Sequence, residues 1–295
     1  MKPKLVTCYV NPDLDGFAGA IAYNEFLQKT GKDSVVGIIG DPSDEVRYIL
    51  DRFSLASPLA IENADNFNEV VLVDASDLNG LEGKISAEKV IEIIDHRKVH
   101  EADKFPRAKV QIELVGAAAT LVAEKFMQNK IEISKESAML LCGAIISNTL
   151  NFKGGVTTDR DKITAEWLNK VAKLPEDFWE ELFVAKSGLI KNMGDKKVGI
   201  AQIEIIGAQK LVAERNAETI QVLDEIKKEM SLDFIFQNTI ELKDAKNFFV
   251  THDSKTQELL EKVLKVQFDG AVAERPNLIM RKQIVPLLKD ELEAK

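Results

Sequence analysis

The chain has 295 residues, of which 45% are apolar, enough for one large hydrophobic core or two ordinary ones. It carries 39 Lys and Arg side chains against 48 Asp and Glu, and the resulting net charge of −9 argues against a surface that binds extended nucleic acid. No apolar run approaches the roughly 18 residues of a membrane span, and the chain does not start like a secretory signal. We therefore expect a cytoplasmic protein without a membrane partner.

In the first 100 residues, short β-branched runs alternate with segments long enough for helices. The expected strands lie at 5–10, 35–39, 70–73 and 90–94, with a helix over about 18–28. This alternation predicts an α/β domain in which a parallel sheet carries helices on both faces. The apolar spacing then becomes helical, and the expected helices, which should pack on the sheet, lie at 119–126, 138–146 and 163–171.

The pattern is interrupted after Leu174, where Pro175, Gly188 and Gly194 indicate a domain boundary. We place a first domain at 1–178, a linker at 179–194 and a second domain at 195–295. The second domain has a smaller α+β pattern, with expected strands at 198–205, 234–242 and 248–251 and expected helices over 211–230 and 256–266.

Three of the predicted parallel strands are followed by acidic residues. Asp13 and Asp15 come after the first strand, Asp74 after the third, and Asp95 with His96 after the fourth. Ligands of open α/β sheets bind beyond the carboxyl ends of the strands, so these groups should meet in one crevice. Each acid taken alone is more often a turn residue or a helix cap. A gathering of like charges is better explained by a bound cation, and the sequence therefore predicts a metal site.

Several other residues are read as local structure. Gly16 is expected to let the chain turn into the following helix, and Gly116 with Thr120 to mark a tight helix start. The segment Thr157–Asp161 is expected to cap the helix that begins near residue 162. Two groups take no part in the predicted site: the thiols Cys8 and Cys142, expected to be buried and reduced, and the histidines His100 and His252, expected at the surface.

Six short motifs follow one another along the chain: Asn11-Pro12-Asp13-Leu14-Asp15, Val73-Asp74, Ile94-Asp95-His96-Arg97, Val115 to Thr120, Ser147 to Lys153, and Met280 to Pro286. Their order resembles the DHH phosphoesterase superfamily. It is most similar to the branch with a DHHA2 C-terminal domain, which contains the manganese-dependent (family II) inorganic pyrophosphatases and related exopolyphosphatases. We find no glycine-rich motif of the sister branch, which cleaves short oligonucleotides, and this disfavours a nuclease.

The resemblance implies a metal-binding DHH domain and a smaller DHHA2-like domain that clamps a small phosphorylated substrate. It implies divalent-metal-dependent hydrolysis of a phosphoanhydride, inorganic pyrophosphate or short polyphosphate, by attack of a metal-bound hydroxide. The expected cofactor is Mn²⁺ or Mg²⁺, as one or two ions. Because the related pyrophosphatases often dimerise, a homodimer is a further expectation.

Carried over position by position, the resemblance implies five metal ligands: Asp13, Asp15, Asp74, His96 and Asn148. Asp74 would bridge the two ions and is expected, with Arg97, to be catalytic. Arg97, Arg281 and Lys282 are expected to bind the phosphate oxygens of the substrate. The resemblance also implies a phosphate-binding lysine, for which the sequence leaves two candidates, Lys186 and Lys191.

The sequence departs from the family at four of these motif positions. Family members have His where Tyr9 and Arg97 stand, Asp where Asn148 stands, and Arg where Met280 stands. Tyr9 removes a nitrogen ligand and Asn148 removes a negative charge, so we expect weaker metal binding or occupancy by one ion. Arg97 cannot give up a proton, although it can hold phosphate. Two alternatives to the hydrolase stay open: an impaired relative that only binds a phosphorylated ligand, and a phosphodiesterase acting on a small nucleotide.

Overall fold

The computed structural model describes residues 2–293, which form two compact units that divide between Lys186 and Ser187. The segment expected to be a linker, 179–194, contains most of helix α6 (Phe178–Ser187) and strand β7 (Ile190–Met193). The domain boundaries 1–178 and 195–295 stay a prediction. Within residues 2–293, the structure has no helix with the length and apolar character needed to cross a bilayer.

The N-terminal unit is built on a six-stranded sheet, in which all neighbouring strands pair in parallel, as predicted. Its strand order is β3-β2-β1-β4-β5-β6, and the strands are β1 (Lys4–Thr7), β2 (Ser34–Ile39), β3 (Leu59–Ile61), β4 (Val70–Val73), β5 (Val90–Asp95) and β6 (Lys109–Ile112). The order of strands reverses between β1 and β4, and such a reversal opens a crevice at the carboxyl ends of the strands.

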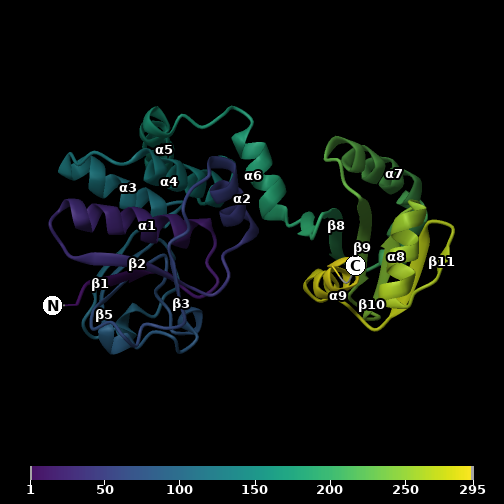
Figure 1. The fold of residues 1–295 in the computed structure, drawn as a ribbon, viewed down its shortest axis with the longest axis horizontal. Coiled ribbons are helices and arrows are strands. Elements are labelled where there is room, and N and C mark those ends of the chain that lie inside the picture. The colour runs from purple at the N-terminus through teal and green to yellow at the C-terminus, as the bar shows by residue number, and fades with distance from the viewer. Residues whose placement is uncertain (1, 294–295) are drawn as a thin grey trace. The chain divides into compact units, whose positions relative to one another are not determined.

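One face of this sheet carries the long helices (Figure 1). They are α1 (Leu14–Lys29), α2 (Asp44–Phe53), α3 (Ala118–Asn129), α4 (Lys135–Asn148) and α5 (Asp159–Ala172). Helix α4 contacts both α1 and α5 and is apolar on nearly all sides, as a helix buried among others must be. Its start is capped by Ser134, whose hydroxyl accepts the Ser137 N–H at 3.1 Å.

The opposite face is covered by loops and three short 3₁₀ helices: η1 (Asn79–Leu81), η2 (Ala87–Lys89) and η3 (Ala102–Lys104). Leu81, Ile85 and Phe105 from this layer pack with Leu5 and Leu72 of the sheet in a second core. Helices therefore lie on both faces, as predicted, but those of the second face are single turns.

The C-terminal unit is the smaller α+β unit that the sequence predicts. Its mixed sheet has the order β11-β12-β10-β9-β8-β7, and β8 and β9 pair in parallel while the other neighbours are antiparallel. The remaining strands are β8 (Lys196–Ile205), β9 (Phe234–Glu241), β10 (Lys246–Val250), β11 (Phe268–Asp269) and β12 (Val272–Pro276). Helix α7 (Ala208–Glu229) packs on one face of this sheet, and α8 (Ser254–Leu264) and α9 (Arg281–Glu293) share a core with the other.

Two segments differ from the sequence prediction. Strand β1 ends at Thr7 and not at Val10, because Val10 leaves the sheet to donate its N–H to the Gly80 carbonyl at 2.9 Å and Asn11 takes a left-handed conformation (φ 55°). Helix α9 was not predicted, because Pro286 lies inside it and removes one helical hydrogen bond.

Candidate metal centre

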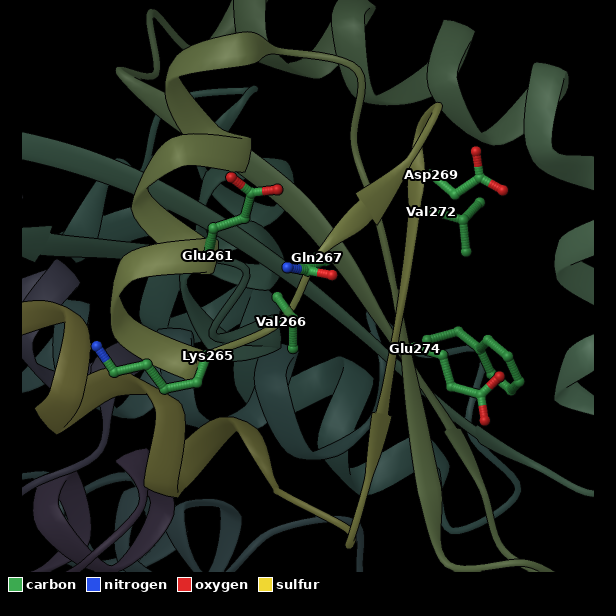
Figure 2. Close-up of a pocket in the computed structure, with 8 residues that line it drawn as sticks. Glu261, Lys265, Val266, Gln267, Asp269, Val272 and Glu274 are labelled. Carbon is green, nitrogen blue, oxygen red and sulfur yellow. The ribbon is translucent and has the colours of Figure 1, made fainter.

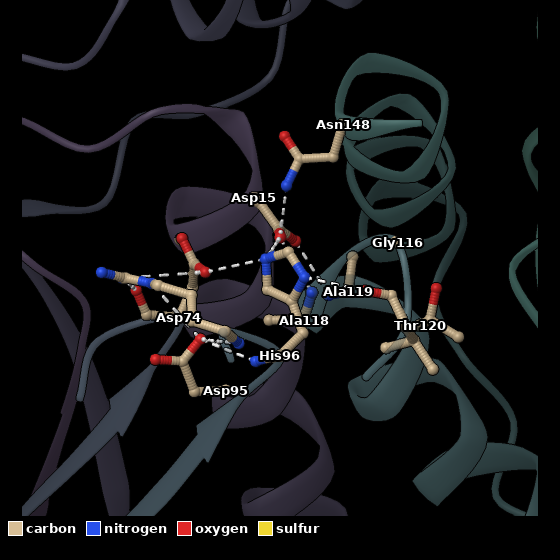
Figure 3. A network of polar contacts seen from close by, with 12 residues as sticks. Asp15, Asp74, Asp95, His96, Gly116, Ala118, Ala119, Thr120 and Asn148 are labelled. Atoms are coloured by element: carbon tan, nitrogen blue, oxygen red, sulfur yellow. Dashed lines mark hydrogen bonds and ion pairs between the residues drawn. The ribbon is translucent and has the colours of Figure 1, made fainter. Parts of the chain in front are cut away.

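Three of the five predicted ligands converge at the carboxyl edge of the first sheet (Figure 3). One ligand atom each from Asp15, Asp74 and His96 lie within 4.8 Å of one another. Asp15 belongs to the first turn of α1, Asp74 directly follows β4, and His96 directly follows β5. The topological switch point of the sheet thus brings together residues that are far apart in the sequence.

Asp15 is fully buried and is held by the start of α3. Its Oδ2 accepts the Ala118 N–H and its Oδ1 the Ala119 N–H, both at 2.8 Å, and Asn148 donates from Nδ2 to Oδ2 at 2.7 Å. Burial first, and then the nearby charge of Asp74, raise the pKa of Asp15 well above its ordinary value. The helix terminus favours the ionised carboxylate, but a bound cation would favour it far more.

His96 is oriented by a main-chain contact. Its Nδ1 donates to the Val115 carbonyl at 2.9 Å, and this leaves Nε2 facing the carboxylates, 3.4 Å from Asp15 Oδ2 and 3.4 Å from Asp74 Oδ1. Such a partner on the far nitrogen is typical of histidines that bind metals. Burial lowers the pKa of His96, but the hydrogen bond to Asp74 and the charges of both acids outweigh it and raise the pKa to about 10.

Asp74 adopts a left-handed backbone conformation, with φ of 57°, which is uncommon for a residue other than glycine or asparagine. Its N–H donates to the Ile94 carbonyl at 2.8 Å, and burial is the main cause that raises its pKa to about 6. Gly16 makes room for this carboxylate. A Cβ there would lie 3.0 Å from the Cβ of Cys8 and 3.5 Å from Asp74 Oδ2, so Gly16 permits close approach inside α1 and does not form the predicted turn.

Asp13 and Tyr9 line the same cavity from the end of the first strand. Asp13 caps α1: its Oδ1 accepts the N–H groups of Asp15 at 3.0 Å and Gly16 at 3.1 Å. It lies outside the group of three, and its role as a metal ligand stays a prediction. Burial, followed by the charges of Asp13 and Asp74, raises the pKa of the Tyr9 phenol well above its ordinary value, so the side chain stays neutral.

Arg97 is bound within the site on several sides. Its Nη1 donates to Asp77 Oδ2 at 3.0 Å, its Nη2 donates to the main-chain carbonyl of Asp74, and its Nε lies 3.4 Å from Asp95 Oδ1. The guanidinium also lies over the ring of Tyr9, 5.3 Å from the ring centroid. About a third of the side chain stays exposed and lines the cavity, so its predicted contact with phosphate is sterically open.

Asp95 supports the site without lining the cavity. Its Oδ1 accepts the N–H groups of His96 at 2.6 Å and Arg97 at 3.3 Å, and its Oδ2 accepts the Ser76 hydroxyl. The sequence grouped it with the other strand-end acids. In the structure both oxygens of its carboxylate accept hydrogen bonds that shape the turn carrying His96.

Asp161 is a supporting residue whose full role the sequence did not reveal. The predicted cap is confirmed, because its Oδ2 accepts the N–H and the hydroxyl of Thr158, both at 2.7 Å. Asp161 also accepts the Gly116 N–H, at 3.0 and 2.9 Å to its two oxygens, and the Thr120 hydroxyl at 2.6 Å. It thereby holds the 115–120 segment. The main chain of this segment contacts both candidate ligands: the Val115 carbonyl accepts the hydrogen bond from His96, and the N–H groups at the start of α3 donate to Asp15. Only the three-dimensional structure shows this second connection.

The donor set suits a divalent ion. Two carboxylates and one imidazole, all largely buried, offer hard oxygens that Mg²⁺ and Mn²⁺ favour and a nitrogen that suits Mn²⁺ better. The adjoining cavity of about 220 Å³ has polar walls, formed by Tyr9, Asp13, Asp74, Gly80, His96, Arg97 and Asn148. Asn148 contributes its amide to this wall, and its role as a ligand stays a prediction.

The two candidate lysines lie in different units. Lys186 donates from Nζ to the Ser147 hydroxyl at 2.6 Å and lies 3.5 Å from Glu45 Oε2, so it supports the end of α4 beside Asn148. Lys191 belongs to β7 of the C-terminal unit. A phosphate-binding role stays a prediction for each.

In the C-terminal unit, the basic segment that contains Arg281 and Lys282 is held mainly through its main chain. Gln202 Oε1 accepts the Arg281 N–H at 2.7 Å, and Arg281 Nη1 donates to the Ile200 carbonyl at 3.3 Å. Fully buried Asn247 accepts the Ile279 N–H and donates to the Ile279 carbonyl, both at 2.8 Å. Lys282, in contrast, is exposed to solvent. Arg281 and Lys282 therefore start α9 from a fixed backbone.

The C-terminal unit also contains an open hollow of about 730 Å³, shown in Figure 2. Glu261 lies on α8 and Glu274 faces the hollow from β12, with Lys265 and Asp269 at other points of its wall. Among residues 2–293, only Asp15, Asp74 and His96 form a group of three acidic or histidine ligands at metal-binding distance. We therefore place the metal centre in the N-terminal unit.

The fold and the site together define a class of phosphoesterase. The DHH family, N-terminal domain, matches residues 4–145, and the DHHA2 domain matches residues 179–291. The chain belongs to the DHH phosphoesterase superfamily, in the branch that carries a DHHA2 domain.

Its relatives narrow the comparison further. The chain is 30% identical to a manganese-dependent inorganic pyrophosphatase of Methanothrix thermoacetophila, over 96% of each chain. It is 28% identical to the manganese-dependent inorganic pyrophosphatase of Bacillus subtilis, over 99% of each chain. A crystal structure of a candidate family II inorganic pyrophosphatase from Methanococcus jannaschii is 29% identical, covers 98% of both chains and aligns with a TM-score of 0.55.

Proposed function

We propose that this protein hydrolyses a phosphoanhydride, inorganic pyrophosphate or a short polyphosphate, with a divalent ion held by Asp15, Asp74 and His96. The observation that carries the proposal is the approach of these three ligand atoms to within 4.8 Å beside a polar cavity. The full-length similarity to manganese-dependent inorganic pyrophosphatases supports both the substrate class and Mn²⁺ as the favoured ion.

In this proposal, different residues hold the metal ion and bind the phosphate. A bound divalent ion lowers the pKa of water and stabilises charge on the attacking and leaving oxygens. Asp15, Asp74 and His96 would hold that ion, and hydrogen bonds with main-chain groups fix the orientation of the Asp15 and His96 side chains. Arg97 lines the cavity with a charge that suits phosphate oxygens. Hydrolysis of pyrophosphate adds one water across the P–O–P bridge and releases two phosphates.

Arg281 and Lys282 are proposed to bind the outer phosphate of the substrate. A guanidinium and an ammonium at the start of a helix can each form charge-assisted hydrogen bonds to phosphate. The fixed backbone at Arg281 supports such a role, because it limits the entropy that ordering the segment would cost.

The decisive experiment measures phosphate release from pyrophosphate, tripolyphosphate and a small phosphodiester, each with Mn²⁺ or Mg²⁺. The proposal expects release from the anhydrides and a loss of roughly 100-fold or more in Asp74→Asn, because the variant weakens the hold on the ion. Asp103→Asn, which changes an exposed acid of η3, is the matched control and should keep full activity.

The assay also separates the alternatives. Release from the phosphodiester alone would favour a phosphodiesterase on a small nucleotide. No phosphate release from any of the three substrates, together with tight Mn²⁺-dependent binding of pyrophosphate, would favour a relative that only binds its ligand. The specific observation behind this second candidate is Arg97, which carries its proton permanently and is already bound to Asp77.

A further inference from the structure

Asp74 lies between two different cationic positions. On one side, its Oδ1 lies 3.4 Å from His96 Nε2, in the group proposed to hold the divalent ion. On the other side, its main-chain carbonyl accepts a hydrogen bond from Arg97 Nη2, and the same nitrogen lies 3.9 Å from Oδ1. The same carboxylate oxygen, Oδ1, therefore has the imidazole of His96 and the guanidinium of Arg97 as neighbours, and the guanidinium stands where a second cation near Asp74 would have to approach.

This guanidinium is fixed and not a free surface charge. Asp77 and Asp95 face it at 3.0 and 3.4 Å, and the Tyr9 ring lies beneath it. Gly80 of η1 packs against Tyr9, since a Cβ there would lie 3.2 Å from that of Tyr9. An arginine with three carboxylates around it neutralises charge that a metal would otherwise need to neutralise.

The remaining groups on that side offer few ligands for a second ion. The phenol of Tyr9 is a poor ligand for a divalent ion at neutral pH, because an ordinary tyrosine has a pKa of about 10. Asp13 caps α1 through one oxygen and could offer the other to a metal, so of Tyr9 and Asp13 only Asp13 is a good ligand for a second ion. A second dication would also be repelled by the neighbouring guanidinium.

We infer that the centre takes one divalent ion, and that the guanidinium of Arg97 occupies the place beside Asp74 that a second cation would need. The inference rests on the metal site of the proposed function and does not depend on hydrolysis. A single ion and a fixed arginine then face the substrate cavity together. The ion organises water, while Arg97 offers two charge-assisted hydrogen bonds to a phosphate.

The first test counts ions on the full chain. Equilibrium dialysis against Mn²⁺, read by elemental analysis, should give one ion per chain, and electron paramagnetic resonance should show an isolated Mn²⁺ signal. Two ions per wild-type chain, with the broadened spectrum of a spin-coupled pair, would overturn the inference. This measurement needs no variant and no activity.

The second test converts the arginine side into a metal site. The double variant Tyr9→His with Arg97→His removes the fixed charge and supplies two neutral nitrogen ligands. It should bind two Mn²⁺ ions and show the coupled spectrum, whereas Arg107→His, a change at an exposed arginine, should still bind one. A folded double variant that binds a single ion would contradict the role of Arg97. If the double variant does not fold, the wild-type count decides.

An inactive protein would sink the proposed hydrolysis and leave this inference intact if one ion binds. An active protein with two coupled ions would contradict this inference and leave the proposed hydrolysis intact. The two outcomes are therefore distinguishable from the same preparation.

Discussion

The candidate metal centre of the N-terminal unit and the basic segment of the C-terminal unit are both held by polar groups, but these groups act on side chains in the first and mainly on the backbone in the second. In the metal centre, main-chain and side-chain donors reach the functional carboxylate itself, as Ala118 and Ala119 do for Asp15. In the basic segment, Asn247 and Gln202 fix the backbone of Ile279 and Arg281, and Lys282 points into solvent.

The difference matches what each region is proposed to bind. A metal ion requires ligand atoms placed to within a few tenths of an ångström, so the side chains themselves must be locked. A phosphate held by long basic side chains tolerates adjustment, and fixing only the backbone is sufficient. Substitutions in the two supports should therefore have different consequences.

The largest effect is expected for Asp161→Asn. The amide would lose one acceptor and turn an N–H toward the donors of Gly116 or Thr158, and this should lower the free energy of unfolding of the N-terminal unit by about 4 kcal/mol. Because the 115–120 segment carries the contacts to His96 and Asp15, Mn²⁺ affinity should fall as well.

Urea unfolding followed by tryptophan fluorescence checks this prediction, since both tryptophans, Trp167 and Trp179, belong to the N-terminal unit. The neighbouring variant Asp159→Asn changes an exposed carboxylate of the same helix and should match the wild type. Equal stability of Asp161→Asn and Asp159→Asn would show that the 115–120 segment does not depend on this carboxylate.

The next largest effect is expected for Asn247→Ala. It leaves the N–H of Ile279 unpaired, removes one of the two hydrogen bonds to the Ile279 carbonyl and breaks the contact with Asn238, at a cost of about 2 kcal/mol in the C-terminal unit. Far-UV circular dichroism should show the loss, whereas the tryptophan transition and Mn²⁺ affinity should not change. The exposed Asn192→Ala is the control, and an altered Mn²⁺ affinity in Asn247→Ala would break the comparison.

The sequence predicted the parallel sheet and the convergence of its strand-end acids because both depend on local patterns. Alternating β-branched runs define parallel strands, and the carboxyl ends of such strands share one edge. The same reasoning could not separate Asp74 from Asp95. One faces the cavity and the other binds the turn, and the distinction depends on the backbone conformation after each strand.

The supporting contacts were beyond the sequence for a related reason. Asp161 and Gly116 are 45 residues apart, and nothing in their local pattern pairs them. Likewise, the sequence identified Tyr9 and Arg97 as two separate departures from the family. Their packing, with the guanidinium over the ring, shows that the two changes form one unit.

A smaller effect is expected for Asn148→Asp, which tests the metal side of the comparison directly. A carboxylate here would add charge and a ligand beside Asp15, so Mn²⁺ affinity should rise about tenfold, or about 1.4 kcal/mol. Without metal the same variant should melt at a lower temperature, because two buried carboxylates would repel each other. Thermal melting with and without Mn²⁺ checks both expectations, the gain in stability with the ion and the loss without it. Asn129→Asp is the exposed control.

The smallest effect is expected for Glu25→Gln, a partly buried carboxylate that resembles Asp161 in accepting hydrogen bonds at the start of a helix but lies away from the candidate metal centre. Glu25 accepts the N–H and hydroxyl of Ser134, at 2.8 and 2.7 Å, and pairs with Lys29. Burial raises the pKa of Glu25, but the bonds from Lys29, Ser137 and Ser134 outweigh it, and the net pKa is lowered.

A lowered pKa in the folded state means that the carboxylate stabilises the fold above the ordinary pKa of glutamate and loses this effect as the pH falls through the lowered value. The variant should therefore be less stable by about 1 kcal/mol at neutral pH, and the difference from the wild type should be smaller near pH 3. Urea unfolding at both pH values measures the difference, with the exposed Glu136→Gln as control. Since Glu25 contacts no ligand, Mn²⁺ affinity should stay unchanged. A loss of affinity here would mean that metal binding reports the general stability of the unit and not the specific support that Asp161 gives to Asp15 and His96.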